Sequence, residues 1–292
     1  MTKLDNIANN QVLQKKISFG NFQLTLSAIA TVLLVALAVL VFLQPDIDEK
    51  VLSAVGAAIA FPFGSFLLHR YKVAKARLNY VGITADQYPE VFRLANELCA
   101  QAGISPTPPI FLIRDPSVDP CTLNPGLRNA IVLGTDFLAG SRENNTPNAV
   151  RFMLAHQIGH FVANHHKKRW LLFSAAAMGM LGTKTLIIRN LEFTADAYAA
   201  TVVPEGTIDA LALCAVGKDN YPYVNPDEQN RVARMNQGLM GFLAKWSADQ
   251  VPPPERLRRL DTDGLLERPE DRVVPDHREL FHDDYFTQFK KA

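Results

Sequence analysis

The fold of this chain is decided by the stretch Ala155-His156-Gln157-Ile158-Gly159-His160, together with Leu191-Glu192-Phe193-Thr194-Ala195-Asp196 further along. Two histidines at positions i and i+4 project from one face of a helix, so both imidazoles can reach one metal ion. Hydrolytic zinc sites use a third protein ligand and keep one position open, and Glu192 supplies a carboxylate for that role. Asp196 lies one helical turn after Glu192, where a carboxylate can orient a ligating histidine. The two stretches together predict a metal site.

The first stretch lies in a segment that has the marks of a buried helix. Thr146 and Pro147 form a good N-cap and first-turn pair. An HxxxH pair alone would also fit solvated histidines, but buried histidines need polar partners, and Glu192 and Asp196 can provide them. A broad apolar stripe follows at helical spacing: Val150, Met153, Leu154, Ile158, Phe161 and Val162.

Residues 155–165, Ala-His-Gln-Ile-Gly-His-Phe-Val-Ala-Asn-His, resemble the active-site helix of the HtpX-type membrane metallopeptidases and of the related CAAX prenyl endopeptidases. Residues 192–196, Glu-Phe-Thr-Ala-Asp, match the second motif of these families, whose Glu is the third zinc ligand. The similarity extends from about residue 80 to residue 260, with residues 83–89 and 254–257 resembling the first and last segments of the soluble domain. The chain departs from the pattern at Gln157, where HExxH has Glu, and at Gln250-Val251, where the family often has His-Pro.

The resemblance implies an α+β fold: a helix-dominated, zincin-like metallopeptidase domain with a small β-sheet, preceded by a two-helix transmembrane hairpin. It implies one Zn2+ per chain, held by His156, His160 and Glu192, with Asp196 supporting a ligand. It also implies an endopeptidase that hydrolyses protein or peptide substrates, in particular membrane or misfolded proteins. A strand of four residues would border the cleft, where a peptide can pair with its open edge, although the same residues also fit an ordinary core strand: Ala130, Ile131, Val132 and Leu133.

Gln157 occupies the position of the general base in these peptidases. There, a Glu takes a proton from water and passes it to the leaving amine; the amide of Gln157 has nearly the same shape but cannot accept that proton at neutral pH. A positioned base contributes ~10²–10⁴-fold to the rate, so we expect a catalytically impaired chain whose metal site survives. Two explanations stay open, an enzyme inactivated at one position and a natural pseudopeptidase. A membrane-anchored binding module with a structural metal is a third, and it requires a fourth ligand.

Two further histidines follow the first stretch. His156, His160 and His166 have the spacing of the three-histidine HExxHxxGxxH helix, but that motif needs a Gly where the chain turns, and this position is Ala163. We therefore expect His165 and His166 to form a polar helix end that runs into residues 167–169, where cations suit a helix C-terminus.

Composition narrows the class of protein and its partners. The chain has 292 residues, 48% of them hydrophobic, and a formal net charge of +1. This composition predicts neither a nucleic-acid partner nor a strongly acidic one. Cys99, Cys121 and Cys214 are odd in number and show no CxxC spacing, which predicts reduced thiols inside a cell and argues against a Cys-type zinc site.

The N-terminal part predicts a membrane anchor. Residues 22–43 carry no charge and are long enough to cross a hydrocarbon core of ~30 Å, and residues 51–68 form a second candidate span. Basic residues precede the first span and follow the second, whereas the link between them is acidic. The positive-inside rule and the resemblance therefore predict an integral protein of a bacterial inner membrane, in contact with membrane lipid, with its catalytic domain in the cytoplasm.

We expect the whole chain to divide into three parts: an N-terminal segment and hairpin at 1–79, a metallopeptidase domain at 80–260, and a charged tail at 261–292. Within the domain, we expect a helix ending near Gly103, strands at 110–113 and 130–133, and helices at 191–202 and 231–246. Residues 170–182 are apolar, but too few residues separate His160 from Glu192 for two crossings. We interpret that segment as a helix on the core or the membrane surface.

Overall fold

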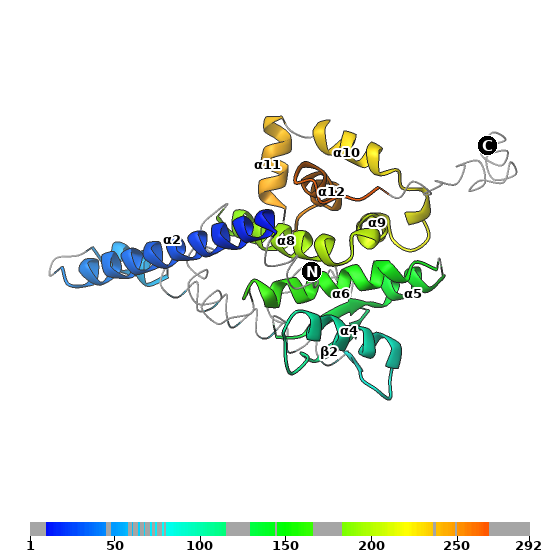
Figure 1. Ribbon diagram of the computed structural model, residues 1–292. Coiled ribbons are helices and arrows are strands. Elements are labelled where there is room, and N and C mark those ends of the chain that lie inside the picture. Colours follow the sequence, from blue (N-terminus) through cyan, green and yellow to red (C-terminus); the bar gives the residue numbers. More distant parts are fainter. Residues whose placement is uncertain are drawn as a thin grey trace, which may run out of the picture.

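The computed structural model describes residues 10–44, 48–57, 80–114, 129–143, 145–165, 183–235, 238–248 and 250–268, with isolated positions between 60 and 78. This part of the chain is dominated by helices and carries a small three-stranded sheet (Figure 1). In chain order the elements are α2 (Gln11–Phe42), β1 (Val81–Ile83), α4 (Pro89–Gln101), β2 (Ile110–Ile113), β3 (Ile131–Gly134), α5 (Thr135–Glu143), α6 (Pro147–Val162), α8 (Thr183–Val202), η1 (Pro204–Gly206), α9 (Thr207–Val216), η2 (Tyr221–Tyr223), α10 (Pro226–Met235), α11 (Leu239–Ser247) and α12 (Pro253–Thr262).

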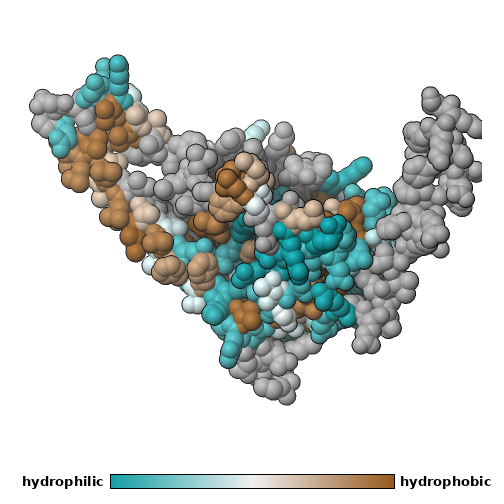
Figure 2. All heavy atoms as spheres, turned by 90° about the horizontal axis from the view of Figure 1, so that it is seen from above, coloured by the Kyte–Doolittle hydropathy of each residue, from teal (hydrophilic) through white to brown (hydrophobic). Residues whose placement is uncertain are grey.

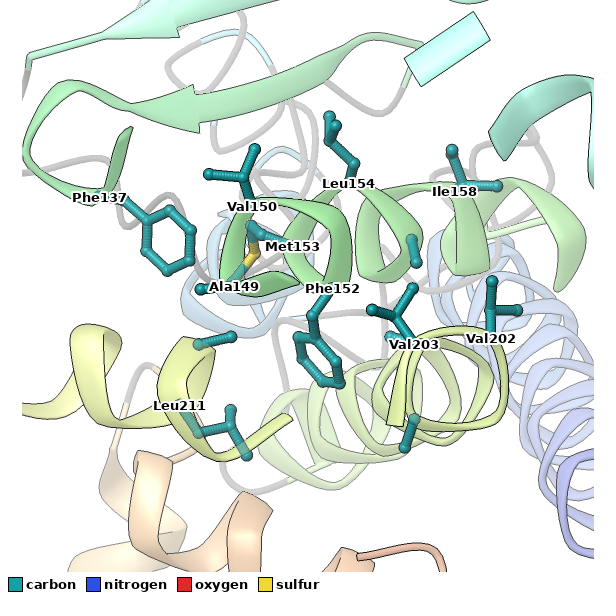
Figure 3. Close-up of a cluster of buried hydrophobic side chains, with 14 of the residues drawn as sticks. Phe137, Ala149, Val150, Phe152, Met153, Leu154, Ile158, Val202, Val203 and Leu211 are labelled. Atoms are coloured by element: carbon teal, nitrogen blue, oxygen red, sulfur yellow. The ribbon is translucent and has the colours of Figure 1, made fainter. Parts of the chain in front are cut away.

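Helix α6 is the centre of the core. It begins after Thr146, as predicted, and its residues from Phe152 to His160 are all buried. Figure 3 shows Val150, Leu154 and Ile158 on the side of α6 that faces the strands, and Phe152 on the opposite side, toward α8 and α9. The helix is therefore packed on both faces, and the apolar stripe in the sequence marks only one of them.

The sheet covers one side of α6. Its order is β1-β2-β3, with β1 antiparallel to β2 and β2 parallel to β3. Ile110 pairs with Ile83 on one side and with Ile131 on the other. Among the described strands, β3 has a neighbour on one side only, and all four of its residues are buried. The predicted strand at 110–113 is confirmed, and the second strand lies one residue later than expected.

Helix ends follow the turn residues in the sequence. Gly103, with φ 70°, lies just after α4, and the N–H groups of Gly103 and Ile104 bond to the carbonyls of Ala100 and Cys99. This is a Schellman turn, which needs a residue in the left-handed region. Helices α8 and α9 meet at 118° around Pro204, because proline and the short η1 turn stop α8 there.

Helix α2 is, among the described residues, the one helix that is by itself long and apolar enough to cross a membrane. It begins well before the predicted span, and its first turns pack on the body of the protein. Leu13 is buried in the main core, and Asn10 caps the helix and donates from Nδ2 to Thr201 Oγ1 at 2.8 Å. From Phe19 onward α2 exposes apolar side chains, and Figure 2 shows this brown surface projecting from the teal body.

Several expectations meet a different structure or fall outside it. The helix predicted at 231–246 is divided into α10 and α11, since Gly238 takes an extended ψ of 176° before α11. Helix α8 begins at Thr183, earlier than the predicted residue 191. Residues 49–57 are helical, but much of the second predicted span after residue 57 lies outside the described residues, as do Cys121, residues 166–182 and the tail beyond 268.

The cysteines depart from the prediction. Cys99 is buried and free, whereas Cys214 is disulfide-bonded, so the expectation of reduced thiols is wrong for Cys214. Disulfides persist mainly in oxidising compartments. This bond therefore favours an oxidising compartment, whereas the basic flanks of the two predicted spans favour the cytoplasm.

Candidate metal centre

Two helices bring three metal-ligating side chains together. Helix α6 presents His156 and His160, and α8 presents Glu192; all three are buried, and their ligand atoms lie within 4.8 Å of one another. The Nε2 atoms of the two histidines are 3.3 Å apart. The carboxylate of Glu192 lies 3.4 Å from Nε2 of His156 and 3.8 Å from Nε2 of His160. The predicted cluster is thus assembled in the structure.

A close approach of the two helices makes this cluster possible. Gly159 on α6 faces Ala195 on α8, and a Cβ added to Gly159 would lie 3.1 Å from both Cα and O of Ala195. Glycine and alanine leave no bulk between the helix backbones at this point, so α8 can come near enough for the carboxylate of Glu192 to reach the imidazoles. Gly159, just before His160, therefore determines how closely Glu192 on α8 can approach the two histidines.

The donor set and its spacing fit a tetrahedral metal such as zinc. Zinc takes imidazole nitrogen and carboxylate oxygen at about 2.0–2.2 Å, which separates neighbouring ligands of a tetrahedron by about 3.4 Å. The two Nε2 atoms are 3.3 Å apart, and Glu192 approaches His156 through Oε2 at 3.4 Å and His160 through Oε1 at 3.8 Å, which is close to this value. The buried group can hold a metal ion, and three protein donors leave a tetrahedral position free.

Asp196 orients His156, as the sequence predicted. Its Oδ1 lies 2.9 Å from Nδ1 of His156. A neutral imidazole that presents its Nε2 lone pair to a metal carries its proton on Nδ1, so His156 donates this hydrogen bond and Asp196 accepts it. Burial lowers the pKa of His156, but its contacts with Asp196 and Glu192 outweigh that effect and raise the pKa above its ordinary value.

Arg256 from α12 holds Asp196 in turn. Its Nε donates to Oδ2 at 2.8 Å and its Nη2 donates to Oδ1 at 2.5 Å, a two-pronged contact in which both side chains are buried. Burial raises the pKa of Asp196, but Arg256 and His156 more than offset this and hold that pKa well below its ordinary range. Sequence reasoning assigned no role to Arg256, although the segment 254–257 was singled out there by its resemblance.

His165 corrects a second expectation. The chain leaves α6 by a Schellman turn at Asn164, with φ 60°, and the N–H of His165 bonds to the carbonyl of His160 at 2.8 Å. This turn folds His165 back into the interior, where its Nδ1 lies 3.0 Å from Nδ1 of His160. His165 is therefore not a polar helix end. It faces the ring nitrogen of His160 that points away from the ligand cluster, as Asp196 does for His156.

The remaining predicted site residues are Gln157, His166 and the strand residues 130–133. Gln157 is buried on α6 directly after His156. His166, the third histidine of the alternative spacing, lies outside the described residues. The predicted substrate strand corresponds to β3, which packs beside α6 and has buried side chains: Ala130, Ile131, Val132 and Leu133.

The buried pair formed by Asp196 and Arg256 generates a stability prediction. Asp196→Asn removes the negative charge that Arg256 contacts with two nitrogens, and breaking a buried ion pair from one side costs about 3–5 kcal/mol. We expect a loss of this size in the free energy of unfolding, measured by urea denaturation of the detergent-solubilised chain. The double variant Asp196→Asn, Arg256→Met should lose less than the two single variants added together, because it leaves neither charge buried alone.

An exposed ion pair provides the control for that cycle. Arg93 and Glu97 are 3.9 Å apart on α4 and largely exposed, so Glu97→Gln should change the free energy of unfolding by less than about 1 kcal/mol. Because the pKa of Asp196 is lowered, its contribution should be present above about pH 4 and should disappear as the pH falls further. An Asp196→Asn variant as stable as Glu97→Gln would contradict the structural role.

The position of His165 generates a prediction about metal affinity. Removing a partner of a ligating histidine typically weakens metal binding about 10–100-fold. We expect this loss for His165→Ala, measured by competition against a chromophoric chelator. His165→Gln should recover part of the affinity, because its amide oxygen can accept a hydrogen bond from His160. An alanine variant that binds zinc as tightly as the parent chain would show that His165 only fills space.

Comparison of the chain with protein-family models, with curated proteins and with solved structures finds no match.

Proposed function

We propose that this chain is a membrane-anchored protein built around a zinc-metallopeptidase site of the HtpX or CAAX endopeptidase type. The observation that carries the proposal is the convergence of His156, His160 and Glu192 at tetrahedral ligand spacing, with Asp196 on the far nitrogen of the first histidine. A zincin-like fold accounts for this pairing of a two-histidine helix with a second helix that supplies a carboxylate.

Each residue has a distinct task in such a site. His156, His160 and Glu192 hold the zinc ion, which when bound supplies Lewis acidity toward a peptide carbonyl and acidifies water. Asp196 and Arg256 keep the proton of His156 on Nδ1, so that its Nε2 lone pair stays directed at the cluster. His165 acts in the same way on His160. The burial of all these groups keeps their electrostatic interactions strong.

Gln157 determines how far the reaction can proceed. The amide at this position can donate and accept hydrogen bonds but cannot take up a proton at neutral pH. The chain as written therefore binds metal and protein or peptide substrates but cleaves them slowly or not at all. An inactivated peptidase and a natural pseudopeptidase both have this property. The variant Gln157→Glu distinguishes both of them from a binding module whose metal is purely structural.

The anchor bears on the class of substrate. A site next to a membrane-crossing helix suits membrane or misfolded proteins, and quality-control cleavage is the activity that the HtpX resemblance implies. Prenyl-peptide processing fits less well, because it relies on a chamber of many membrane helices. A peptide would pair by backbone hydrogen bonds with the edge of β3 that has no strand neighbour among the described residues.

Restoring the base is the experiment that tests the function. We expect the purified chain to carry about one zinc ion per molecule, and His156→Ala or Glu192→Ala to abolish this in a metal analysis. Gln157→Glu should raise the hydrolysis of an unfolded protein such as casein by at least ~10²-fold, since it restores a proton acceptor. A chelator, or Glu192→Ala in the same background, should remove the gained activity.

Gln157→Ala is the matched control, because it alters the same position without adding a carboxylate, and it should gain no activity. A Gln157→Glu chain that binds zinc yet cleaves neither casein nor itself would leave the binding-module alternative as the explanation. A chain with no zinc in either background would remove the metal site from the proposal.

The location of the domain gives a separate prediction. From the basic flanks of the anchor we expect a reporter fused after Lys291 to behave as cytoplasmic and one placed at Asp48 to behave as external. Thiol labelling of Cys214 in intact cells provides the check, because a cytoplasmic domain should hold this residue reduced. The reverse reporter pattern, with Cys214 protected from labelling, would place the site on the oxidising side.

A further inference from the structure

A large cavity lies on the other side of α8 from the metal centre. It is open to the surface, has a volume of about 1190 Å³ and is lined by the first half of α2, by α8, α11 and α12. Arg189, Asn190 and Phe193 on α8 line it, whereas Glu192 and Asp196 on the same helix face the histidines. The cavity is thus separate from the candidate metal centre.

The lining of this cavity is strongly basic. Six cationic side chains border it against two carboxylates. Each carboxylate is shared by two cations: Asp263 lies 2.7 Å from Lys16 and 3.3 Å from Arg259, and Glu255 lies 2.9 Å from Lys245 and 2.7 Å from Arg258. The cavity therefore keeps a surplus of positive charge after its internal ion pairs are formed.

Two of the cations are available for a ligand. Lys15 and Arg189 line the cavity, and neither forms an ion pair with any residue in the described part of the chain. Arg189 is half-buried, and burial lowers its pKa. Glu255 attracts this guanidinium from a longer distance. A guanidinium that is partly withdrawn from water and has no carboxylate in direct contact is the kind of group that an anion would stabilise.

The same cavity contains polar atoms that lack partners. Oε1 of Gln23 and Nδ2 of Asn190 are buried there, and neither has a hydrogen-bond partner in the described structure. One of them is an acceptor and the other a donor. A ligand that carries both hydroxyl groups and phosphate oxygens would satisfy both atoms, whereas an apolar side chain would satisfy neither.

The position of the cavity on α2 indicates the source of such a ligand. Its α2 residues run from Val12 to Gln23, at the start of the apolar stretch of this helix. Beyond it, α2 turns exposed apolar side chains outward, as the brown surface in Figure 2 shows. A phosphate in the cavity would lie at headgroup depth, and acyl chains could continue along α2. Basic pockets beside membrane helices bind anionic lipid headgroups in this way.

We propose that this cavity binds the headgroup of an anionic glycerophospholipid, with Lys15 and Arg189 on its phosphate and its acyl chains along α2. Gln23 and Asn190 then bond to glycerol hydroxyl and phosphate oxygens. The proposal does not depend on the metal or on peptidase activity, since none of its residues belongs to the ligand cluster.

Binding of a lipid probe to the full chain in neutral detergent tests the assignment. The probe is phosphatidylglycerol with a fluorophore on one acyl chain, the reference is the matching phosphatidylcholine, and fluorescence anisotropy gives Kd. Phosphatidylglycerol should bind more tightly than the reference. Each cation near a membrane surface contributes about a fivefold factor toward anionic lipid, so Lys15→Gln with Arg189→Gln should weaken binding about thirtyfold.

A matched double variant distinguishes binding in the cavity from nonspecific electrostatic attraction of the lipid to the protein. Arg93→Gln with Arg231→Gln removes the same charge from exposed positions outside the cavity, and it should leave Kd within about twofold. Equal losses in the two double variants would overturn the proposal. Lys15 is itself exposed, so Lys15→Gln alone, with an expected loss of about fivefold, provides the test if the double variant does not fold.

Inorganic phosphate distinguishes the two sources of a phosphate group. Because the acyl chains contribute to binding, excess phosphate should displace the lipid probe only weakly. Complete displacement by phosphate, with no preference of the chain for phosphatidylglycerol over phosphatidylcholine, would show that the cavity takes a free anion and would overturn the lipid assignment.

Discussion

The site depends on one constraint, the distance between α6 and α8 at Gly159. Any side chain there would meet the backbone of Ala195 at 3.1 Å, and α8 would have to move outward. Glu192 approaches both histidines at once. An outward shift of α8 by a few tenths of an ångström would therefore lengthen its contacts with His156 and His160 together. The metal centre is therefore a consequence of helix packing, and the apolar core around Phe152 and Leu154 fixes that packing.

Burial of charge is the second requirement, and the structure meets it by linking ionisable groups in series. Glu192 contacts His156, His156 contacts Asp196, and Asp196 contacts Arg256. An isolated buried charge costs several kcal/mol, whereas Asp196 contacts both His156 and Arg256, and Glu192 and the two Nε2 atoms converge on a point where a cation would fit. The arrangement ties α12 to α8 and α6, so the end of the domain contributes to a site whose ligands all come from its middle.

Which contacts of the candidate site can be predicted from the sequence depends on how far apart in the chain the contacting residues lie. The pairing of His156 with His160 is local, because helical geometry alone places i and i+4 on one face, and Asp196 follows Glu192 by the same rule. The role of Arg256 is not local, because a contact across sixty residues depends on how α12 packs. His165 was misjudged for another reason: the basic run after it suggests an exposed end, but Asn164 in the left-handed region reverses the chain and buries the ring. Similarly, the hydropathy of α2 marks a helix apolar enough to cross a membrane but carries no sign that Leu13 belongs to the core.

Gln157 lies among the groups that position the candidate ligands. His156 contacts Asp196, Asp196 contacts Arg256, His160 contacts His165, and Gly159 lets α8 approach α6. Formal charges also remain balanced: with a divalent ion, Glu192, Asp196 and Arg256, the centre carries one net positive charge, and a glutamate at 157 would bring it to zero. Under the proposed function, a neutral amide leaves this positive charge in place but provides no acceptor for a proton. Position 157 would then govern cleavage, whereas Asp196, Arg256 and His165 would hold the ligands.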